Sequence, residues 1–159
     1  MDFDILPARG EAEIAEIRTL RREYANWLGV AHIFDELEAE LALLPGRYAP
    51  PAGELLLARG RDAAPLGCIG VRPFARAGAC EIKHLYVRGE RRGGGVGAAL
   101  VAAAVRSAVA SGYREALLDV LPSMASALSI YRALGFEQTP PYWPNTVSGA
   151  LFFAKRLQT

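Results

Sequence analysis

The sequence predicts a mixed α/β (α+β) domain in which four helices and six strands follow one another along the chain. Three observations predict this class. Two stretches near the N-terminus repeat apolar residues at helix spacing, short apolar runs bounded by turn residues follow them, and a glycine-rich turn joins one such run to a later helix. Because 159 residues are within the size of one domain, we expect residues 1–159 to fold as a single unit.

Two helices follow a short first strand at residues 2–7. Between residues 11 and 28 apolar side chains recur three, four or seven positions apart, and Gly29 is a natural end for this helix. The second helix, at residues 33–44, carries leucines on one face and ends at Pro45-Gly46. Both helices therefore precede most of the strands.

Three strands come next in the sequence. Residues 53–59 and 66–75 are apolar runs separated by the turn residues 60–62. Ala77-Gly78 then turns the chain into a strand at residues 80–87.

This third strand does not alternate strictly between apolar and polar residues. The apolar phase shifts by one residue between Ile82 and Leu85. Because side chains alternate along a strand with a period of two, such a slip predicts a β-bulge near Lys83-His84.

The second half of the chain continues with alternating elements. An alanine-rich helix is predicted at residues 96–111 and a buried strand at residues 114–121. Ser123 is a candidate cap for a helix at residues 123–134, and residues 151–157 form the last strand.

Composition excludes several classes of protein. The 18 basic and 17 acidic residues leave a net charge of +1, which provides no overall basic field for nucleic acid. The longest apolar stretch, at residues 96–105, is about half of the ~20 residues that a membrane-spanning helix needs. Together with the acidic N-terminus, this predicts a cytoplasmic protein without membrane or nucleic-acid partners.

The two cysteines and two histidines do not predict a disulfide or a metal site. In the hairpin predicted above, Cys80 lies opposite about Ala75 and Cys68 opposite about Val87, which is too far apart for a bond between them. No Cys-x-x-Cys or His-x-x-x-His spacing occurs. We therefore expect two buried free thiols and no bound metal.

A glycine-rich turn, residues 88–98, separates the strand at 80–87 from the following helix. Glycines let the backbone approach a ligand closely, and a helix N-terminus offers unpaired N–H groups at the positive end of its dipole. Arg88, Arg91 and Arg92 add positive charge. The combination predicts a polyphosphate site, the alternative being a flexible turn with solvated arginines.

A dinucleotide site is a competing interpretation of the same turn. The spacing Gly93-x-Gly95-x-x-Ala98, with Asp119 further on, nominally matches the dinucleotide fingerprint. Five residues separate the strand from the first glycine, however, and too few elements follow for a doubly wound sheet. No Gly-Lys-Ser/Thr is present either, so a P-loop is excluded.

Three segments resemble the GNAT family of N-acetyltransferases, bacterial single-domain members in particular. They are Glu-Ile-Lys-His-Leu-Tyr-Val at 81–87, Arg92-Gly-Gly-Gly95-Val-Gly97, and Ala127-x-x-Ile130-Tyr131-Arg132-x-Leu134-Gly135-Phe136. The resemblance implies a mostly antiparallel sheet of about six or seven strands, flanked by about four helices and splayed between strands 4 and 5. It also implies acetyl-CoA as the cofactor.

The resemblance assigns residues to this cofactor. They are Leu85, Tyr86, Val87, Arg92, Gly93, Gly94, Gly95, Val96, Gly97, Ala98 and Ser123. The backbone amides of the turn would hold the pyrophosphate, and the strand before it would pair with the pantetheine arm.

Acyl transfer from a thioester to an amine needs a base for the ammonium and an acid for the thiolate. Glu81 is the candidate base, the alternatives being a water chain as base and a cross-strand pairing of Glu81 with Arg72 or Lys83 on a solvated face. Tyr131, which matches the tyrosine of the family's second motif, is the candidate acid, the alternative being a core aromatic.

The acceptor is expected between the early helices and the last loop. The candidate residues there are Tyr24, Trp27, His32, Phe34, Tyr142 and Asn145, each of which could also serve packing alone. The predicted activity is transfer of an acetyl group to a primary amine of a small molecule or peptide, by direct attack in a ternary complex. The alternative is an acyl-CoA-binding sensor with little turnover, and the apolar segment 150–154 is a candidate homodimer surface.

Overall fold

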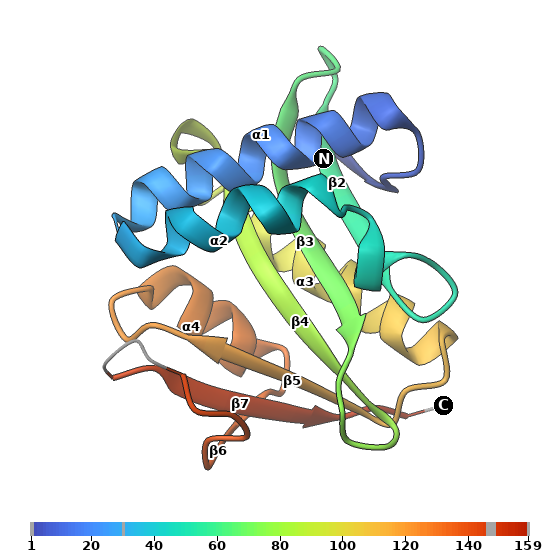
Figure 1. Ribbon diagram of the computed structural model, residues 1–159, viewed down its shortest axis with the longest axis vertical. Coiled ribbons are helices and arrows are strands. Elements are labelled where there is room, and N and C mark those ends of the chain that lie inside the picture. The colour runs from blue at the N-terminus through green and yellow to red at the C-terminus, as the bar shows by residue number, and fades with distance from the viewer. Residues whose placement is uncertain (1, 30, 146–148, 159) are drawn as a thin grey trace.

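One seven-stranded sheet runs through the protein, with its strands in the order β1-β2-β3-β4-β5-β7-β6 (Figure 1). The computed structural model describes residues 2–29, 31–145 and 149–158, and within these the side chains of residues 31–35 lie outside the description. The elements are β1 (Phe3–Pro7), α1 (Glu11–Leu28), α2 (Ala31–Ala42), η1 (Gly46–Tyr48), β2 (Glu54–Gly60), β3 (Pro65–Pro73), β4 (Ala79–Val87), η2 (Gly89–Arg91), α3 (Val96–Ala110), β5 (Glu115–Val120), α4 (Ala125–Ala133), β6 (Glu137–Thr139) and β7 (Leu151–Arg156).

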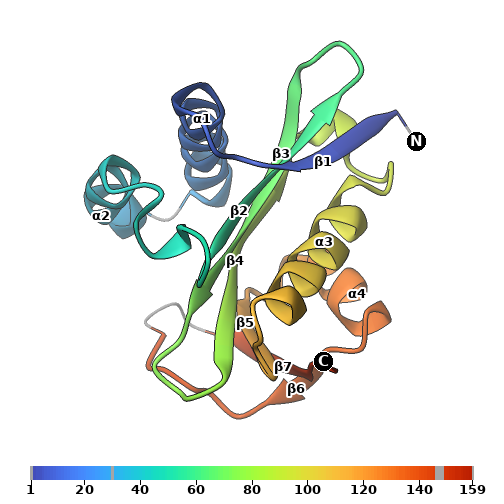
Figure 2. The same cartoon turned by 90° about the vertical axis from the view of Figure 1, so that its right-hand side faces the viewer.

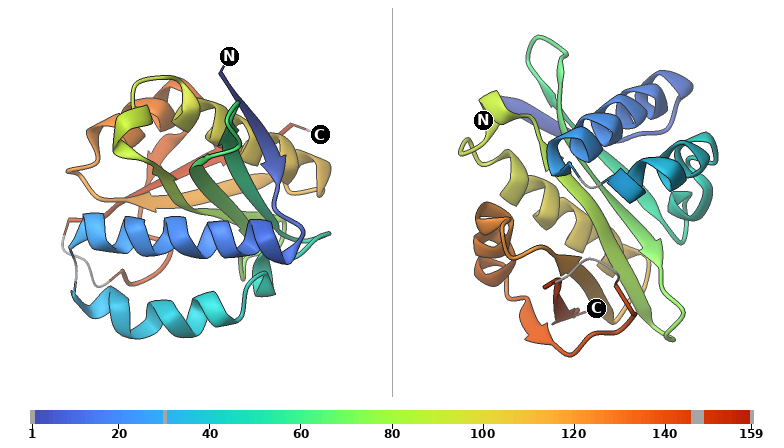
Figure 3. Two further views of the ribbon diagram at one scale, coloured as in Figure 1. Left: turned by 90° about the horizontal axis from the view of Figure 1, so that it is seen from above. Right: turned by 60° about the vertical axis from the view of Figure 1, so that its left-hand side comes forward.

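Helices cover both faces of the sheet. Figure 2 shows α1 and α2 on one face and α3 and α4 on the other, and α1 and α2 lie side by side when seen from above (Figure 3). The apolar residues of β2 face both layers of helices. Leu55 and Leu57 are in the core under α1 and α2, whereas Leu56 and Ala58 are in the core under α3. Because side chains alternate along a strand, a continuous apolar run fits a strand that is covered on both sides.

The sheet splays where β4 meets β5, which is its one parallel pair among the described strands. Pairing is restricted to residues 79–81 of β4 and 115–117 of β5. Beyond that point the two strands separate (Figure 1). The predicted fold class, including the splay between strands 4 and 5, is confirmed.

The predicted β-bulge is present in β4. Gly70 of β3 pairs with Lys83 and Cys68 pairs with Tyr86, so two residues of β4 lie opposite one of β3. One of these two, His84, has a φ of 61°, in the left-handed region. The bulge follows Lys83, just beyond Glu81, the last residue of β4 that pairs with β5.

Three local predictions need correction. The three-residue strand β6 follows α4 and was missed, because it is too short to show a period. Ser123 does not cap α4, whose cap position is Met124 with no side-chain hydrogen bond. The hairpin register also differs from the prediction: Cys80 lies opposite Pro73 and Cys68 opposite Tyr86.

Both cysteines are free and buried, as expected. Burial raises the pKa of each thiol to about 12. Neither therefore offers a thiolate near neutral pH.

Candidate active site

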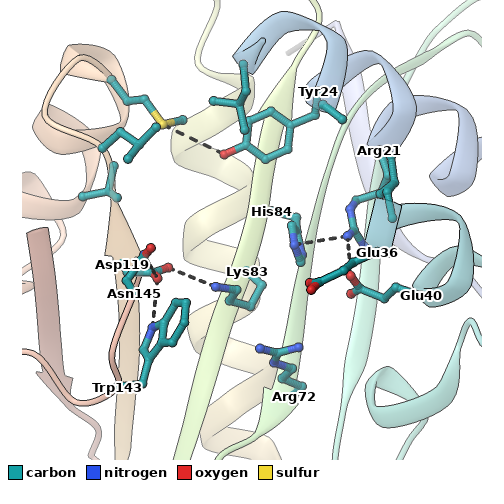
Figure 4. A pocket seen from close by; sticks show the side chains of 16 residues that line it. Arg21, Tyr24, Glu36, Glu40, Arg72, Lys83, His84, Asp119, Trp143 and Asn145 are labelled. Carbon is teal, nitrogen blue, oxygen red and sulfur yellow. Dashed lines mark hydrogen bonds and ion pairs between the residues drawn. The ribbon is translucent and has the colours of Figure 1, made fainter. Parts of the chain in front are cut away.

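Two cavities lie at the splay. The small cavity, about 260 Å³, is bounded by the end of β4, the glycine-rich turn and the start of α4. The large cavity, about 520 Å³, lies between α1 and α2 on one side and the middle of β4 and the end of β5 on the other (Figure 4). Met124 lines both cavities and marks where they meet.

The glycine-rich turn leaves open space beside the start of α3. Gly93 and Gly95 have φ values of 87° and 86°, and a Cβ atom at either would meet no atom within 4 Å. Gly95 is the cap residue of α3, and no described side chain caps this helix. The first amides of α3 are therefore available to an anion, as a polyphosphate site requires.

The arginines of this turn have different partners. Arg88 is bound to Glu23 by an ion pair of 2.6 Å, so its charge is already balanced. Arg92 donates to the carbonyl of Val87 at 2.9 Å, and its guanidinium lies 4.6 Å from the ring centre of Trp27. Arg92 thus stays beside the small cavity, held by a cation–π contact.

Seven of the eleven predicted cofactor residues line the small cavity: Leu85, Tyr86, Val87, Arg92, Gly93, Gly97 and Ser123. The other four, Gly94, Gly95, Val96 and Ala98, lie in the turn and the first turn of α3. The side chain of Val96 is buried in the core, so only its backbone could serve a ligand.

The large cavity is lined by charges that the sequence analysis did not assign to the acceptor. They are Arg21, Glu36, Glu40, Arg72, Lys83 and Asp119. Asp119 is the most connected: one carboxylate oxygen accepts from Lys83 Nζ at 3.0 Å, and the other accepts from Trp143 Nε1 and Asn145 Nδ2 at 3.0 and 2.8 Å. It ties β4, β5 and the loop after β6 together at the cavity wall.

His84 is neutral at the floor of this cavity. Arg21 can only donate, so His84 Nε2 accepts its hydrogen bond of 3.1 Å, and the ring proton lies on Nδ1, 3.3 Å from the Tyr48 hydroxyl. Burial, helped by the charge of Arg21, holds the pKa of His84 well below its usual range. With Nε2 engaged in this way, His84 is not placed to accept a proton from a substrate.

Tyr131 is buried in the core under α3 and α4, and it is not among the residues described as lining either cavity. Its ring packs edge-on against Phe136, with centroids 5.8 Å apart. Burial, and the nearby Tyr24 and Asp119, raise the pKa of its hydroxyl. The hydroxyl therefore stays protonated and can donate a hydrogen bond.

Glu81 is buried behind the large cavity and is not among the residues described as lining it. One of its oxygens accepts from Arg72 at 2.8 and 3.1 Å, and the other from the Tyr142 hydroxyl at 2.6 Å. Lys83 Nζ lies 3.8 Å away. The pairing with Arg72 is the cross-strand alternative that the sequence analysis left open, but it is buried and not on a solvated face.

The predicted acceptor residues are dispersed. Tyr24 and Asn145 line the large cavity, whereas Trp27 lines the small one. Tyr142 packs between Phe74 and Phe152, beside Glu81. His32 and Phe34 fall in the first turns of α2, where the side chains are outside the described part of the structure.

Some of the missed residues carry a signal in the sequence. Asp119 interrupts an apolar run near the end of β5, and a charge there is costly unless it is paired or used. Glu36 and Glu40 are four residues apart on α2 and therefore share one helix face. Neither pattern shows by itself that these residues meet in one cavity.

Comparison with known proteins agrees with the geometry. The model of the acetyltransferase (GNAT) family matches residues 15–136, and the chain belongs to this family. An uncharacterised N-acetyltransferase of Schizosaccharomyces pombe is 34% identical over 140 residues, which cover 88% of this chain and 86% of that protein. An acetyltransferase named for IAA from Azospirillum brasilense is 28% identical over 136 residues, covering 79% and 88% of the two chains.

Solved structures share the fold. A GNAT-family acetyltransferase of Staphylococcus aureus superposes with a TM-score of 0.82 at 16% identity, over 98% of this chain and 99% of that one. The PaiA N-acetyltransferase of Thermoplasma acidophilum, solved in complex with coenzyme A, gives a TM-score of 0.75 at 19% identity, with 98% and 99% coverage.

The protein is thus an acyltransferase of a family whose acyl donor is acetyl-CoA. The expected restriction to bacterial members is not supported, because similar proteins come from fission yeast and Dictyostelium as well. In the described part of the chain, no helix has the length and hydrophobicity of a membrane span. Nor do three or more His, Cys, Asp or Glu side chains gather there as a metal-binding group.

Proposed function

We propose that this protein transfers the acetyl group of acetyl-CoA to a primary amine of a small molecule or peptide, by direct attack in a ternary complex. The observation that carries the proposal is the junction of the two cavities at Met124. One cavity begins at the open glycine-rich turn before α3, and the other is lined by polar and charged groups. Both reactants can therefore be held at once, which is what direct attack requires.

The small cavity fits the cofactor by the chemistry of its lining. The open turn at Gly93 and Gly95 suits the pyrophosphate, with Arg92 beside it. The apolar side chains of Leu85 and Val87 suit a pantetheine arm laid along β4 where β5 has left it. When bound, acetyl-CoA supplies an activated carbonyl and a thiolate leaving group.

The reaction forms a carbon–nitrogen bond and breaks the carbon–sulfur bond, while one proton leaves the nitrogen and one reaches the sulfur. Tyr131 would donate a hydrogen bond to the developing thiolate, since its hydroxyl stays protonated. Both oxygens of Glu81 already accept hydrogen bonds, which supports the route through water in the large cavity. Glu81 would then position Arg72 and Tyr142.

Thiol release from acetyl-CoA, measured over a panel of primary amines, tests the activity. Release that depends on the amine is expected. Cofactor binding without release from any amine would favour the sensor alternative.

A matched pair of glycine variants tests the cofactor site. Gly95→Val should weaken coenzyme A binding at least tenfold in titration calorimetry, because a side chain there fills the space beside the turn. Gly112→Val is the control: its φ of 87° imposes the same backbone strain, and its Cβ would also meet open space, but it lies past the far end of α3. Equal affinities in the two variants would contradict the phosphate site.

A cytoplasmic location and a homodimer paired through residues 150–154 remain predictions. Cell fractionation and light scattering, respectively, would test them.

A further inference from the structure

The large cavity carries an unbalanced negative charge on its α2 wall. Arg72 and Lys83 are each matched by a carboxylate, Glu81 for the first and Asp119 for the second. On the opposite wall Arg21 faces two carboxylates, Glu36 and Glu40, and is bound to Glu40 alone (Figure 4).

Two observations show that these carboxylates are not fully paired by the described residues. Glu40 Oε2 accepts from Arg21 at 3.1 Å, whereas Glu40 Oε1 is a buried atom of a partly exposed side chain and has no hydrogen-bond partner in the described part of the chain. Glu36 is exposed at the mouth of the cavity and forms no ion pair with any described residue, so its charge is open to a ligand. A buried carboxylate oxygen without a donor is costly, so a cationic donor from a ligand would stabilise this wall.

The other groups of the cavity do not offset this charge. His84 is neutral and accepts from Arg21, so it adds no positive charge. The rings of Tyr24 and Trp143 also line the cavity and can cover an alkyl chain.

We propose that the acceptor is an α,ω-diamine or polyamine, with its second ammonium group held by Glu36 and Glu40. This inference rests on the proposed acetyl transfer for the position of the reacting amine. That amine must be neutral where the cavities meet at Met124, whereas the distal amine keeps its charge at the α2 wall. A diamine thus provides both the neutral amine that reacts and the cation that the α2 wall binds.

Binding can be measured apart from catalysis, because the chain has two tryptophans and each lines a different cavity. In a Trp27→Phe background the emission of Trp143 reports on the large cavity. Titration with butane-1,4-diamine, butylamine and 4-aminobutyrate at neutral pH compares a second cation, a methyl group and an anion at the distal end. We expect the diamine to bind at least tenfold more tightly than either of the others.

Three variants assign the effect to the α2 wall. Glu36→Gln should weaken diamine binding about tenfold and leave butylamine binding unchanged. Glu40→Gln should do the same, but it also removes the partner of the buried Arg21, so Glu36→Gln is the decisive variant if Glu40→Gln fails to fold. Glu38→Gln is the matched control, since Glu38 pairs with Arg22 and does not line the cavity.

The outcomes separate this inference from the proposed function. Diamine binding without thiol release would support the diamine site and refute the acetyl transfer. Acetylation of monoamines at the same efficiency as diamines would support the acetyl transfer and refute the diamine site. Tighter binding of 4-aminobutyrate, or diamine affinity unaffected by Glu36→Gln, would overturn the diamine assignment.

Discussion

Replacing Glu81 by glutamine removes a buried charge while keeping the shape of the side chain. The Glu81 side chain is only 3% exposed, and its partners Arg72 and Lys83 are 22% and 15% exposed. Breaking a fully buried ion pair costs about 3–5 kcal/mol, because the remaining charge is left without a partner. Here water can reach the remaining cations and the amide oxygen of glutamine still accepts one hydrogen bond, so we expect a loss of about 2 kcal/mol.

Urea unfolding of both proteins measures this loss as a lower midpoint at unchanged slope. Glu115→Gln is the matched control. Glu115 lies on the neighbouring strand β5 and pairs with the half-exposed Arg76, so the same substitution should cost less than about 1 kcal/mol there. An unchanged midpoint for Glu81→Gln would refute the structural reasoning.

The same variant decides the path of the proton. If water in the large cavity carries the proton away, Glu81→Gln should keep kcat/KM within about threefold of the wild type across the pH range. A general base contributes about 100-fold or more, and its loss is greatest at low pH, where the amine is hardest to deprotonate. A fall of that size would refute the water route and make Glu81 the base.

Three further predictions concern the cavities and their floor. Burial and neighbouring cations hold the pKa of His84 well below 6.5, so only the unfolded chain takes up that proton as the pH falls. The free energy of unfolding should therefore decline below about pH 6.5 by up to ~1.4 kcal/mol per pH unit. His84→Asn, in which asparagine tolerates the φ of 61°, should flatten this decline in urea melts between pH 5.5 and 7. Tyr131→Phe should lower kcat about tenfold with acetyl-CoA and less with an acyl donor whose thiol is more acidic, whereas an equal loss with every donor would mean that the hydroxyl only positions the cofactor. In a Trp143→Phe background coenzyme A should quench the emission of Trp27. Replacing Trp27 by leucine should weaken coenzyme A binding about fivefold, because Arg92 loses the nearer of its two cation–π partners and keeps only Tyr86 at 5.7 Å. Wild-type affinity in calorimetry would contradict a role for this contact.

Local patterns determined most of the elements. The helix predicted at residues 11–28 is found at Glu11–Leu28, because amphipathic spacing and a glycine stop act within the segment itself. The bulge at His84 and the open glycine-rich turn at residues 88–98 were likewise visible, since a phase slip and a glycine cluster are local features. The strand β6 was not visible, because three residues are too few to show a period.

What only the tertiary structure decided is which local features meet. Trp27 was predicted beside the acceptor, and the structure places it in the lining of the small cavity and not of the large one, which the spacing within α1 alone does not determine. Asp119 and Glu36 line one cavity although 82 positions in the chain separate them. The apolar period of a helix or strand tells which of its faces is buried, but the partner of that face is chosen by packing between distant segments, and this choice carries no local signal in the sequence.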